Sequence, residues 1–218
     1  MGECTYCAIR FAAGPLRSKP LDKILEEFDA GLQNGYQEFK LIAGDLGAYG
    51  QDLGTNVAIL LERLLRRKTD YRLTLLDMAP HWFVQYSAEL TRLFAANQEK
   101  IRLLMLPIQS GNSAVLKRMC RPDIVSSLAP KLKALRSQIP TLALATHVLV
   151  GFPGESEQEF EDTLKLLRTV KFDRVDVYRY SDRPNTEATQ LPGKVSEEIK
   201  KQRTLRILGE FAGTALTI

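Results

Sequence analysis

The sequence predicts an α/β fold in which short parallel strands alternate with helices and close part of a (β/α) barrel. The chain has 218 residues and is 44% hydrophobic, which is enough to bury one substantial core. Segments with strand character and segments with helical periodicity alternate along it. The strand candidates are apolar on both faces, as expected where helices cover a parallel sheet or surround a barrel.

Five short apolar segments are predicted as strands. They are 39–43, 71–76, 101–108, 142–150 and 172–180. Each is followed by a segment with helical character, so the chain forms successive strand–helix–strand units. Such units cross over with right-handed connections, and five of these strands can form an open, partial barrel.

The helices are predicted from apolar residues spaced three and four apart, which lie on one helical face. The clearest case is 18–35, where Leu21, Leu25, Phe28 and Leu32 follow this spacing and Gly35 suits the end of the helix. The other predicted helices are 56–68, 81–97, 112–138 (one helix or a pair), 156–171 and 196 to about 215.

Polar and glycine-rich residues come directly after the predicted strands. They are Gly44 and Asp45, Asp77, Gln109 to Gly111, Gly151 to Glu155, and 181–186. Because the carboxyl ends of parallel strands meet at one edge, these residues lie where α/β folds place ligand sites. The competing interpretation is that these loops are polar only because they face solvent.

The composition excludes several classes of protein. With 30 Lys plus Arg against 26 Asp plus Glu, the net charge of +4 permits an RNA partner without arguing for one. No apolar run approaches the ~20 residues that span a bilayer, and the start MGECTYCAIR does not resemble a signal peptide. Three cysteines do not suggest a disulfide framework. We therefore expect a cytoplasmic protein without membrane contact.

Cys4 and Cys7 form a C-x-x-C pair whose thiolates can share a metal or cluster. Alone, the pair also fits half a zinc site, a redox pair or chance. Zinc needs two more ligands, and the remaining Cys120, His81 and His147 are not paired at short spacing. We expect Cys120 to be a buried residue of a helix, His81 to have a structural role at a helix start, and His147 to belong to the core.

Five motifs occur in order along the chain. They are CTYCAIR, GAYGQDLGTN, LPIQSGNSAVLKRM, VGFPGESEQEFEDTL and FDRVDVYRYSDRPNTEA. Together they resemble the radical SAM methylthiotransferase family, over a region from Cys4 to about Arg203. The loop 46–56 is most similar to the branch that acts on threonylcarbamoyl-adenosine beside the tRNA anticodon.

The resemblance implies that the chain is the radical SAM core domain over residues 1–218. The family's cluster motif is C-x-x-x-C-x-x-C, and Cys4 and Cys7 match its second and third cysteines. The first would fall one position before Met1, and the strand leading into the motif is missing too. We therefore expect a TIM-like radical SAM barrel with its first strand truncated. The family's amino-terminal domain with a second cluster and its carboxyl-terminal RNA-binding β-barrel have no counterpart here.

The resemblance also implies the chemistry of the whole enzyme. Three thiolates hold a 4Fe-4S cluster, and S-adenosylmethionine chelates its fourth iron. An electron from a donor protein, passed through the cluster, yields a 5′-deoxyadenosyl radical that abstracts hydrogen from an adenine carbon of tRNA. With two cluster cysteines and no sulfur-donor domain, this chain alone is expected to have little or no activity.

Seven residues receive cofactor-binding roles from the resemblance. Tyr6 matches the aromatic position whose backbone meets the adenine, and Gly44 with Asp45 matches the contact to the methionyl ammonium. Asp45 alternatively serves only as a turn residue. The remaining assignments are Gln109 and Ser110 to the ribose or carboxylate, Arg121 to the methionyl carboxylate, and Gly151 to close backbone approach to the adenosine.

Other residues have competing interpretations. Arg121 alternatively lies on the surface, and Glu155 is expected to cap the next helix. The basic clusters 66–68 and 200–206 could contact phosphates but fit solvated helix ends better. Met105 and His147 depart from the residues usual in the family.

Two other functions remain open at this point. One is a radical SAM methylthiotransferase that modifies an aspartate of a ribosomal protein. The other is a domain that binds S-adenosylmethionine or a partner without any cluster.

Overall fold

The structure is a computed structural model that describes residues 3–217. Its centre is a six-stranded sheet in the order β1-β2-β3-β4-β5-β6, with every neighbouring pair parallel. The strands are β1 (Glu38–Leu41), β2 (Arg72–Leu75), β3 (Ile101–Met105), β4 (Ala143–Val150), β5 (Arg174–Arg179) and β6 (Ala215–Thr217). Strand order equals chain order, so each strand–helix–strand unit adds its second strand directly beside its first, and the predicted α/β fold is confirmed.

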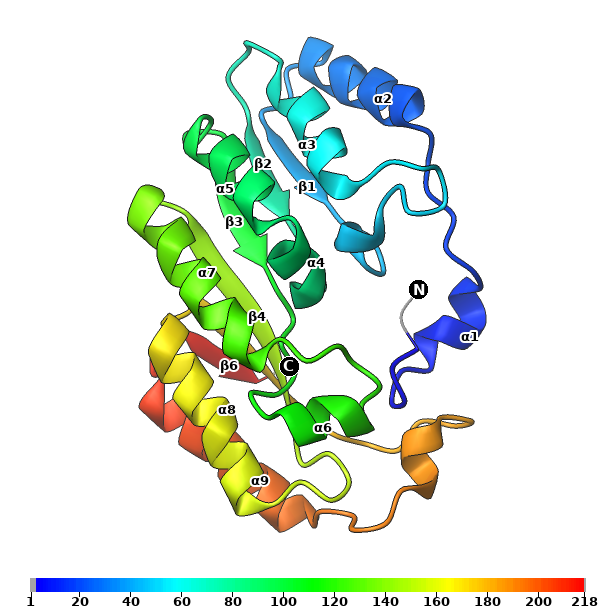
Figure 1. Ribbon diagram of the computed structural model, residues 1–218, viewed down its shortest axis with the longest axis vertical. Helices are drawn as coiled ribbons and strands as arrows, with labels where there is room; N and C mark the ends of the chain where they lie inside the picture. The colour runs from blue at the N-terminus through cyan, green and yellow to red at the C-terminus, as the bar shows by residue number, and fades with distance from the viewer. Residues whose placement is uncertain (1–2, 218) are drawn as a thin grey trace.

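Helices connect successive strands and form a layer along the sheet (Figure 1). The first half of the chain contains α1 (Ile9–Ala13), α2 (Leu21–Gln33), the 3-10 helix η1 (Leu46–Ala48), α3 (Val57–Leu65), α4 (Pro80–Gln85) and α5 (Ser87–Ala95). The second half contains α6 (Ser113–Arg118), α7 (Val125–Gln138), α8 (Glu157–Val170), the 3-10 helix η2 (Glu187–Gln190) and α9 (Glu197–Glu210). The core lies between these helices and the sheet, where Leu61, Leu104 and Leu164 are fully buried.

Two helix predictions need correction, and one open alternative is decided. The segment 81–97 is two helices, which meet at Tyr86. Of the two possibilities for 112–138, the structure has the pair, α6 and α7. The last helix ends at Glu210 instead of about 215, because the chain turns at Gly213 (φ 87°) and then adds β6 to the sheet.

The amino-terminal segment contains no strand among the described residues. Residues 3–8 form turns, and the short helix α1 follows them. In Figure 1, α1 lies apart from the helical layer, on the other side of the molecule from α7 and α8. The segment is held in place by backbone contacts made by Thr5, which position the site described next.

Candidate functional site

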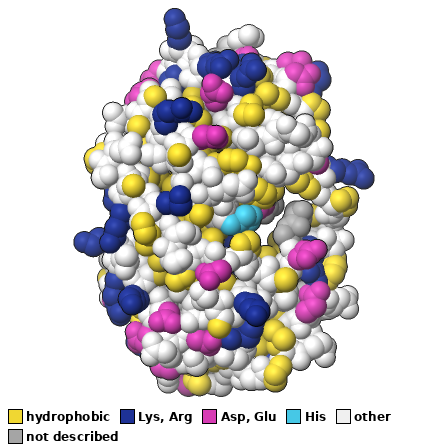
Figure 2. All heavy atoms as spheres, viewed as in Figure 1, with side chains coloured by type: hydrophobic (Ala, Val, Ile, Leu, Met, Phe, Trp, Pro, Cys, Tyr) yellow, Lys and Arg dark blue, Asp and Glu magenta, His cyan; other side chains and the backbone are white. Residues whose placement is uncertain are grey.

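A cavity of about 250 Å³ lies where the amino-terminal segment meets the loops that follow β1, β2 and β3. The lining residues are Cys4, Tyr6, Cys7, Ile9, Arg10, Gly44, Asp45, Asp77, Ala79, His81, Pro107, Gln109, Cys120, Arg121, Pro122 and His147. The face of the molecule drawn in Figure 2 shows a histidine side chain near its centre, beside a hollow. The loops after the strands therefore do meet at one edge, as the sequence predicted.

Seven of the nine predicted site residues line this cavity, whereas two do not. Ser110 is fully buried, lies 3.3 Å (Oγ to Oγ1) from Thr163 on α8, and accepts a hydrogen bond from the Asn112 N–H. Gly151 faces α9, where a Cβ atom on it would lie 2.3 Å from Lys200 Cγ. Both residues therefore serve packing between the sheet edge and the helices.

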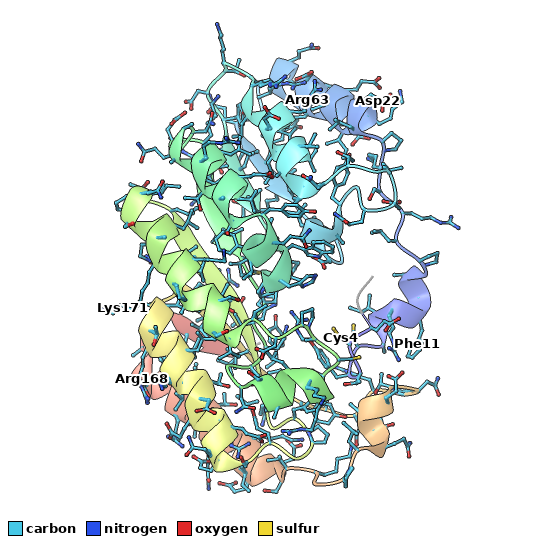
Figure 3. All side chains as sticks on the ribbon, viewed as in Figure 1. Cys4, Phe11, Asp22, Arg63, Arg168 and Lys171 are labelled. Carbon is cyan, nitrogen blue, oxygen red and sulfur yellow. The ribbon has the colours of Figure 1, made fainter. Side chains whose placement is uncertain are left out.

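Thr5 anchors the two cysteines. Its N–H donates to the Met119 carbonyl (3.1 Å), and its hydroxyl donates to the Arg118 carbonyl (3.0 Å). Its own carbonyl accepts from the Ala188 N–H (3.0 Å). These bonds tie the C-x-x-C turn between α6 and η2, so that the cavity wall includes both thiols; Figure 3 shows Cys4 on this segment.

Arg121 joins the cysteines to the rest of the cavity. Its Nη1 lies 3.5 Å from Cys4 Sγ and 3.4 Å from the Tyr6 hydroxyl, and its Nη2 donates to the Pro107 carbonyl (2.8 Å). Burial lowers the pKa of Arg121, but Tyr6 and Cys4 outweigh this effect and the net direction is upward. Burial also raises the pKa of Tyr6, which stays a neutral phenol. The surface interpretation of Arg121 is wrong, because its guanidinium lies between the Cys4 sulfur, the Tyr6 hydroxyl and the Pro107 carbonyl.

Asp45 and Gln109 are fixed by the backbone around them. Asp45 Oδ1 accepts from the Gly47 and Ala79 N–H groups (both 3.0 Å), and its Oδ2 accepts from the Trp82 indole N–H (2.9 Å). Asp45 therefore holds η1 against α4 while it lines the cavity. Gln109 has a left-handed backbone (φ 63°), and its N–H and carbonyl both bond to β4.

The structure contradicts the predictions for Cys120 and His147 and confirms the predicted helix-start position of His81. Cys120 is exposed and follows the end of α6 in the left-handed conformation (φ 55°), so the prediction of a buried helical cysteine is wrong. His81 lies in the first turn of α4, as predicted, and it also lines the cavity. His147 does not belong to the core, because its side chain is 18% exposed and lines the cavity too. Burial lowers the pKa of each imidazole.

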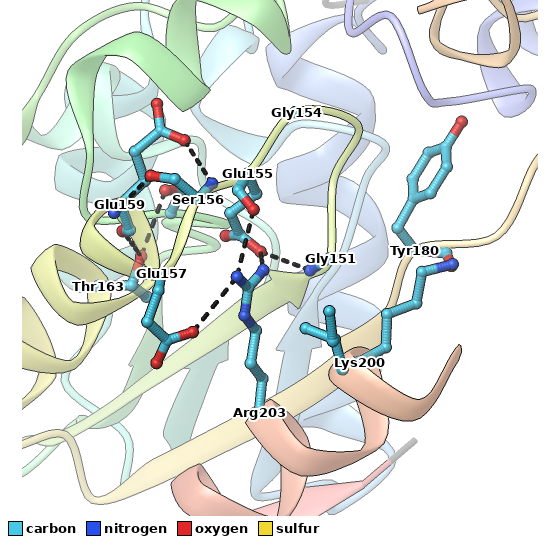
Figure 4. A network of polar contacts seen from close by, with 12 residues as sticks. Gly151, Gly154, Glu155, Ser156, Glu157, Glu159, Thr163, Tyr180, Lys200 and Arg203 are labelled. Carbon is cyan, nitrogen blue, oxygen red and sulfur yellow. Dashed lines mark hydrogen bonds and ion pairs between the residues drawn. The ribbon is translucent and has the colours of Figure 1, made fainter. Parts of the chain in front are cut away.

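The loop after β4 is closed by a buried ion pair (Figure 4). Glu155 accepts from the Gly151 N–H (2.6 Å) and from Arg203 Nη1 (2.8 Å), and both charged side chains are buried. Burial raises the pKa of Glu155 to about 7, although the Gly151 N–H and Arg203 both favour the carboxylate. Ser156, not Glu155, caps α8, through a reciprocal capping box with Glu159. The capping role expected for Glu155 is therefore wrong.

The basic clusters divide between buried and exposed side chains. Lys200 and Arg203 are buried, and the Lys200 ammonium donates to the Tyr180 carbonyl (2.8 Å). Arg66 and Arg67 pair with Glu62 and Asp29. On the face in Figure 2, Lys and Arg side chains are scattered among acidic ones. The expected solvated position is therefore wrong for Lys200 and Arg203, whereas Arg66 is exposed.

Comparison with known families identifies the class. The model of the Radical SAM superfamily matches residues 1–167, and the chain belongs to this superfamily. Its fold is similar to that of a radical S-adenosylmethionine methyltransferase, TsrM, from Kitasatospora setae (TM-score 0.68, 13% identity, 86% of this chain and 36% of that chain). The predicted TIM-like radical SAM architecture is thereby confirmed.

Curated relatives point to methylthiotransferases. The chain is 39% identical over 210 residues to the threonylcarbamoyladenosine tRNA methylthiotransferase MtaB of Thermotoga maritima, covering 96% of this chain and 48% of that protein. It is 40% identical over 208 residues to the ribosomal protein uS12 methylthiotransferase RimO of Desulfotalea psychrophila, covering 94% and 46%. The chain thus spans about half the length of the curated relatives that it matches.

The residues present fit part of a cluster site. Cys4 and Cys7 supply two thiols to one cavity, and Arg121 lies beside the first. Within residues 3–217, no three His, Cys, Asp or Glu side chains come together as a metal site. The position of the motif's first cysteine precedes Met1, outside these residues. No helix in the described part of the chain is long and apolar enough to cross a bilayer.

Proposed function

We propose that residues 1–218 are the radical SAM core of an enzyme that methylthiolates an adenosine next to the tRNA anticodon. The convergence of Cys4, Cys7 and Arg121 in one cavity, at the carboxyl edge of the sheet, is the observation that carries the proposal. The similarity to methylthiotransferases along nearly the whole chain supports it. The whole enzyme would act in the cytosol with an electron donor protein.

Each cavity residue has a role in this proposal. Cys4 and Cys7 are two ligands of a 4Fe-4S cluster, which when bound supplies the electron that cleaves S-adenosylmethionine. Arg121 holds a negative charge beside Cys4, either the thiolate or the methionyl carboxylate. Asp45 faces the methionyl ammonium, since its carboxylate retains about one free lone pair after three hydrogen bonds. Gln109 offers its amide to the ribose.

The choice of tRNA over ribosomal protein rests on one observation. The loop 46–56 resembles the threonylcarbamoyladenosine branch. Overall identity does not separate the two, because relatives of both kinds are equally similar.

A cluster-reconstitution experiment tests the proposal. The 218-residue chain would be compared with the same chain carrying one cysteine added before Met1, both treated anaerobically with iron and sulfide. We expect about four irons per chain only in the extended protein, together with 5′-deoxyadenosine when dithionite and S-adenosylmethionine are added. The unextended chain should hold less iron and form no methylthiolated product.

Cysteine variants sharpen the result. In the extended protein, Cys7→Ser should abolish the cluster, whereas Cys120→Ser should keep it. Iron retained in Cys7→Ser would contradict the ligand assignment. Tight S-adenosylmethionine binding by a chain that never takes up iron would favour the cluster-free binding domain instead.

A further inference from the structure

His147 is fixed from behind by a charged pair on the neighbouring strand. His147 on β4 and Asp176 on β5 are direct cross-strand partners, and their side chains lie on the same face. Imidazole Nε2 lies 3.4 Å from Asp176 Oδ2, while Asp176 Oδ1 accepts from Arg174 Nε (2.8 Å). Asp176 is buried, and because its carboxylate is the acceptor that faces Nε2 at 3.4 Å, it favours the tautomer with the proton on Nε2.

The other imidazole nitrogen faces Asp77 at the cavity. Asp77 follows β2 with a left-handed backbone (φ 56°), and its Oδ1 lies 3.9 Å from His147 Nδ1. Both side chains line the cavity, whereas Asp176 lies behind them. With the proton on Nε2, Nδ1 and the Asp77 carboxylate are two hydrogen-bond acceptors that face one another at a distance too long for a hydrogen bond.

Among the described residues, no protein group donates a hydrogen bond to either acceptor, and both side chains are partly exposed, Asp77 by 32% and His147 by 18%. Arg174 is committed to Asp176, and Tyr178 packs edge-on against the imidazole with ring centroids 5.2 Å apart. Within residues 3–217, His147 is the one basic side chain at ion-pair distance from Asp77. Two converging acceptors with one uncompensated negative charge are complementary to a ligand that brings two hydrogen-bond donors.

We infer that Asp77 and His147 together bind a paired hydrogen-bond donor of a nucleoside, meaning two neighbouring O–H or N–H groups. Their separation suits one donor on each acceptor, which a single N–H cannot provide. The nucleoside class rests on the proposed function, whose cofactor and substrate both contain adenosine. The donors come from a ribose diol or from the N–H and O–H groups of an N6-threonylcarbamoyl substituent.

Three probes distinguish these sources by calorimetric titration of the 218-residue chain. They are adenosine, 2′,3′-dideoxyadenosine and N6-threonylcarbamoyladenosine. If the diol is the donor, both nucleosides that carry it bind about tenfold or more tightly than the dideoxy probe, as expected for bonds to a charged acceptor. If the substituent is the donor, only the threonylcarbamoyl probe binds about tenfold or more tightly than the dideoxy probe.

In either case, Asp77→Asn should remove the discrimination between probes, because its amide can donate to Nδ1 and occupy the acceptor. Asp70→Asn is the matched control, since Asp70 is exposed at the opposite end of β2, and it should keep the discrimination. Discrimination that survives in Asp77→Asn, or its absence in the unmodified chain, would overturn the inference.

Imidazole ¹⁵N NMR gives a readout that does not depend on a variant. His81 and His147 are the only two histidines, so His81 serves as an internal reference. The favoured probe should move the Nδ1 resonance of His147 in the direction of an accepted hydrogen bond; an unmoved Nδ1 would refute the inference. Cluster formation and S-adenosylmethionine cleavage test the proposed function separately, so either hypothesis can fail without the other.

Discussion

The loop after β4 and the cavity wall are both polar, yet they differ in how their polar atoms are satisfied. In the loop, Glu155, Arg203 and the Gly151 N–H satisfy one another inside the protein. On the cavity wall, Asp77 and His147 present acceptors to open space. The first arrangement is closed within the protein, whereas the acceptors of the second remain open to donors from solvent or from a ligand. Whether the polar groups have hydrogen-bond partners inside the protein therefore distinguishes a structural polar cluster from a binding site at the same edge of the sheet.

The largest expected loss of stability comes from breaking the buried Glu155–Arg203 pair in the loop after β4. Arg203→Met would leave the buried Glu155 carboxylate without its cation, and breaking a buried pair in this way costs about 3–5 kcal/mol. Urea denaturation would measure the loss. Arg206→Met is the control, because Arg206 is 43% exposed and its pairs with Glu157 and Glu161 contribute at most about 1 kcal/mol. Equal losses in the two variants would mean that the network is not structural.

A smaller loss is expected for Gly151→Ala. The residue has φ 76°, and the new Cβ would lie 2.3 Å from Lys200 Cγ. A left-handed alanine costs about 1–2 kcal/mol and overpacking about 1–3 kcal/mol more. Gly35→Ala also has a positive φ (82°), at the end of α2, but has open space around it, so only the first cost applies. Chemical denaturation of both variants would compare them, and an equal loss in the two would show that contact with α9 is unimportant.

The smallest expected change in unfolding free energy concerns His147 on the cavity wall, and it depends on pH. Burial lowers the pKa of His147 below 6.5, although Asp77 and Asp176 oppose this and Arg174 adds to it. The unfolded chain then binds more protons, so the stability contributed by neutral His147 is complete above pH 6.5 and is lost as the pH falls through the folded pKa. His147→Gln should reduce the slope of unfolding free energy between pH 7 and 5, by less than about 1.4 kcal/mol per pH unit.

A residual slope should remain in that variant, because burial lowers the pKa of His81 in the same direction. Protonation of Nδ1 would also remove one acceptor, so discrimination between the nucleoside probes should weaken over the same acidic range. An unchanged slope in His147→Gln would show that the imidazole is not held neutral by the fold.

Much of the fold could be predicted from the sequence, because continuous apolar segments and periodic helices carry a strong local signal. All five predicted strands overlap observed ones. The missed elements are short. The helix α1 has five residues and none is buried, so it lacks an apolar face to detect. The strand β6 has three residues and exists through its pairing with β5, which local sequence does not encode.

The sequence predicts a site residue when that residue directly follows a strand, because this position places it at the carboxyl edge of the parallel sheet. Asp45, Asp77 and Gln109 follow strands and were placed at this edge from sequence alone. Ser110 and Gly151 also follow strands, but contacts with α8 and α9 turn them away from the cavity. His147 was assigned to the core because its strand neighbours are apolar; the partners that give it a role, Asp77 and Asp176, are distant in sequence.

The most direct test of the central claim is the electron paramagnetic resonance spectrum of the reduced cluster in the chain extended by one cysteine before Met1. If the cavity lined by Cys4, Cys7 and Arg121 holds both cofactors, adding S-adenosylmethionine should shift the spectrum, and Arg203→Lys, outside the cavity, should leave that shift intact. A spectrum that S-adenosylmethionine does not change would contradict the assignment of this cavity as the cofactor site.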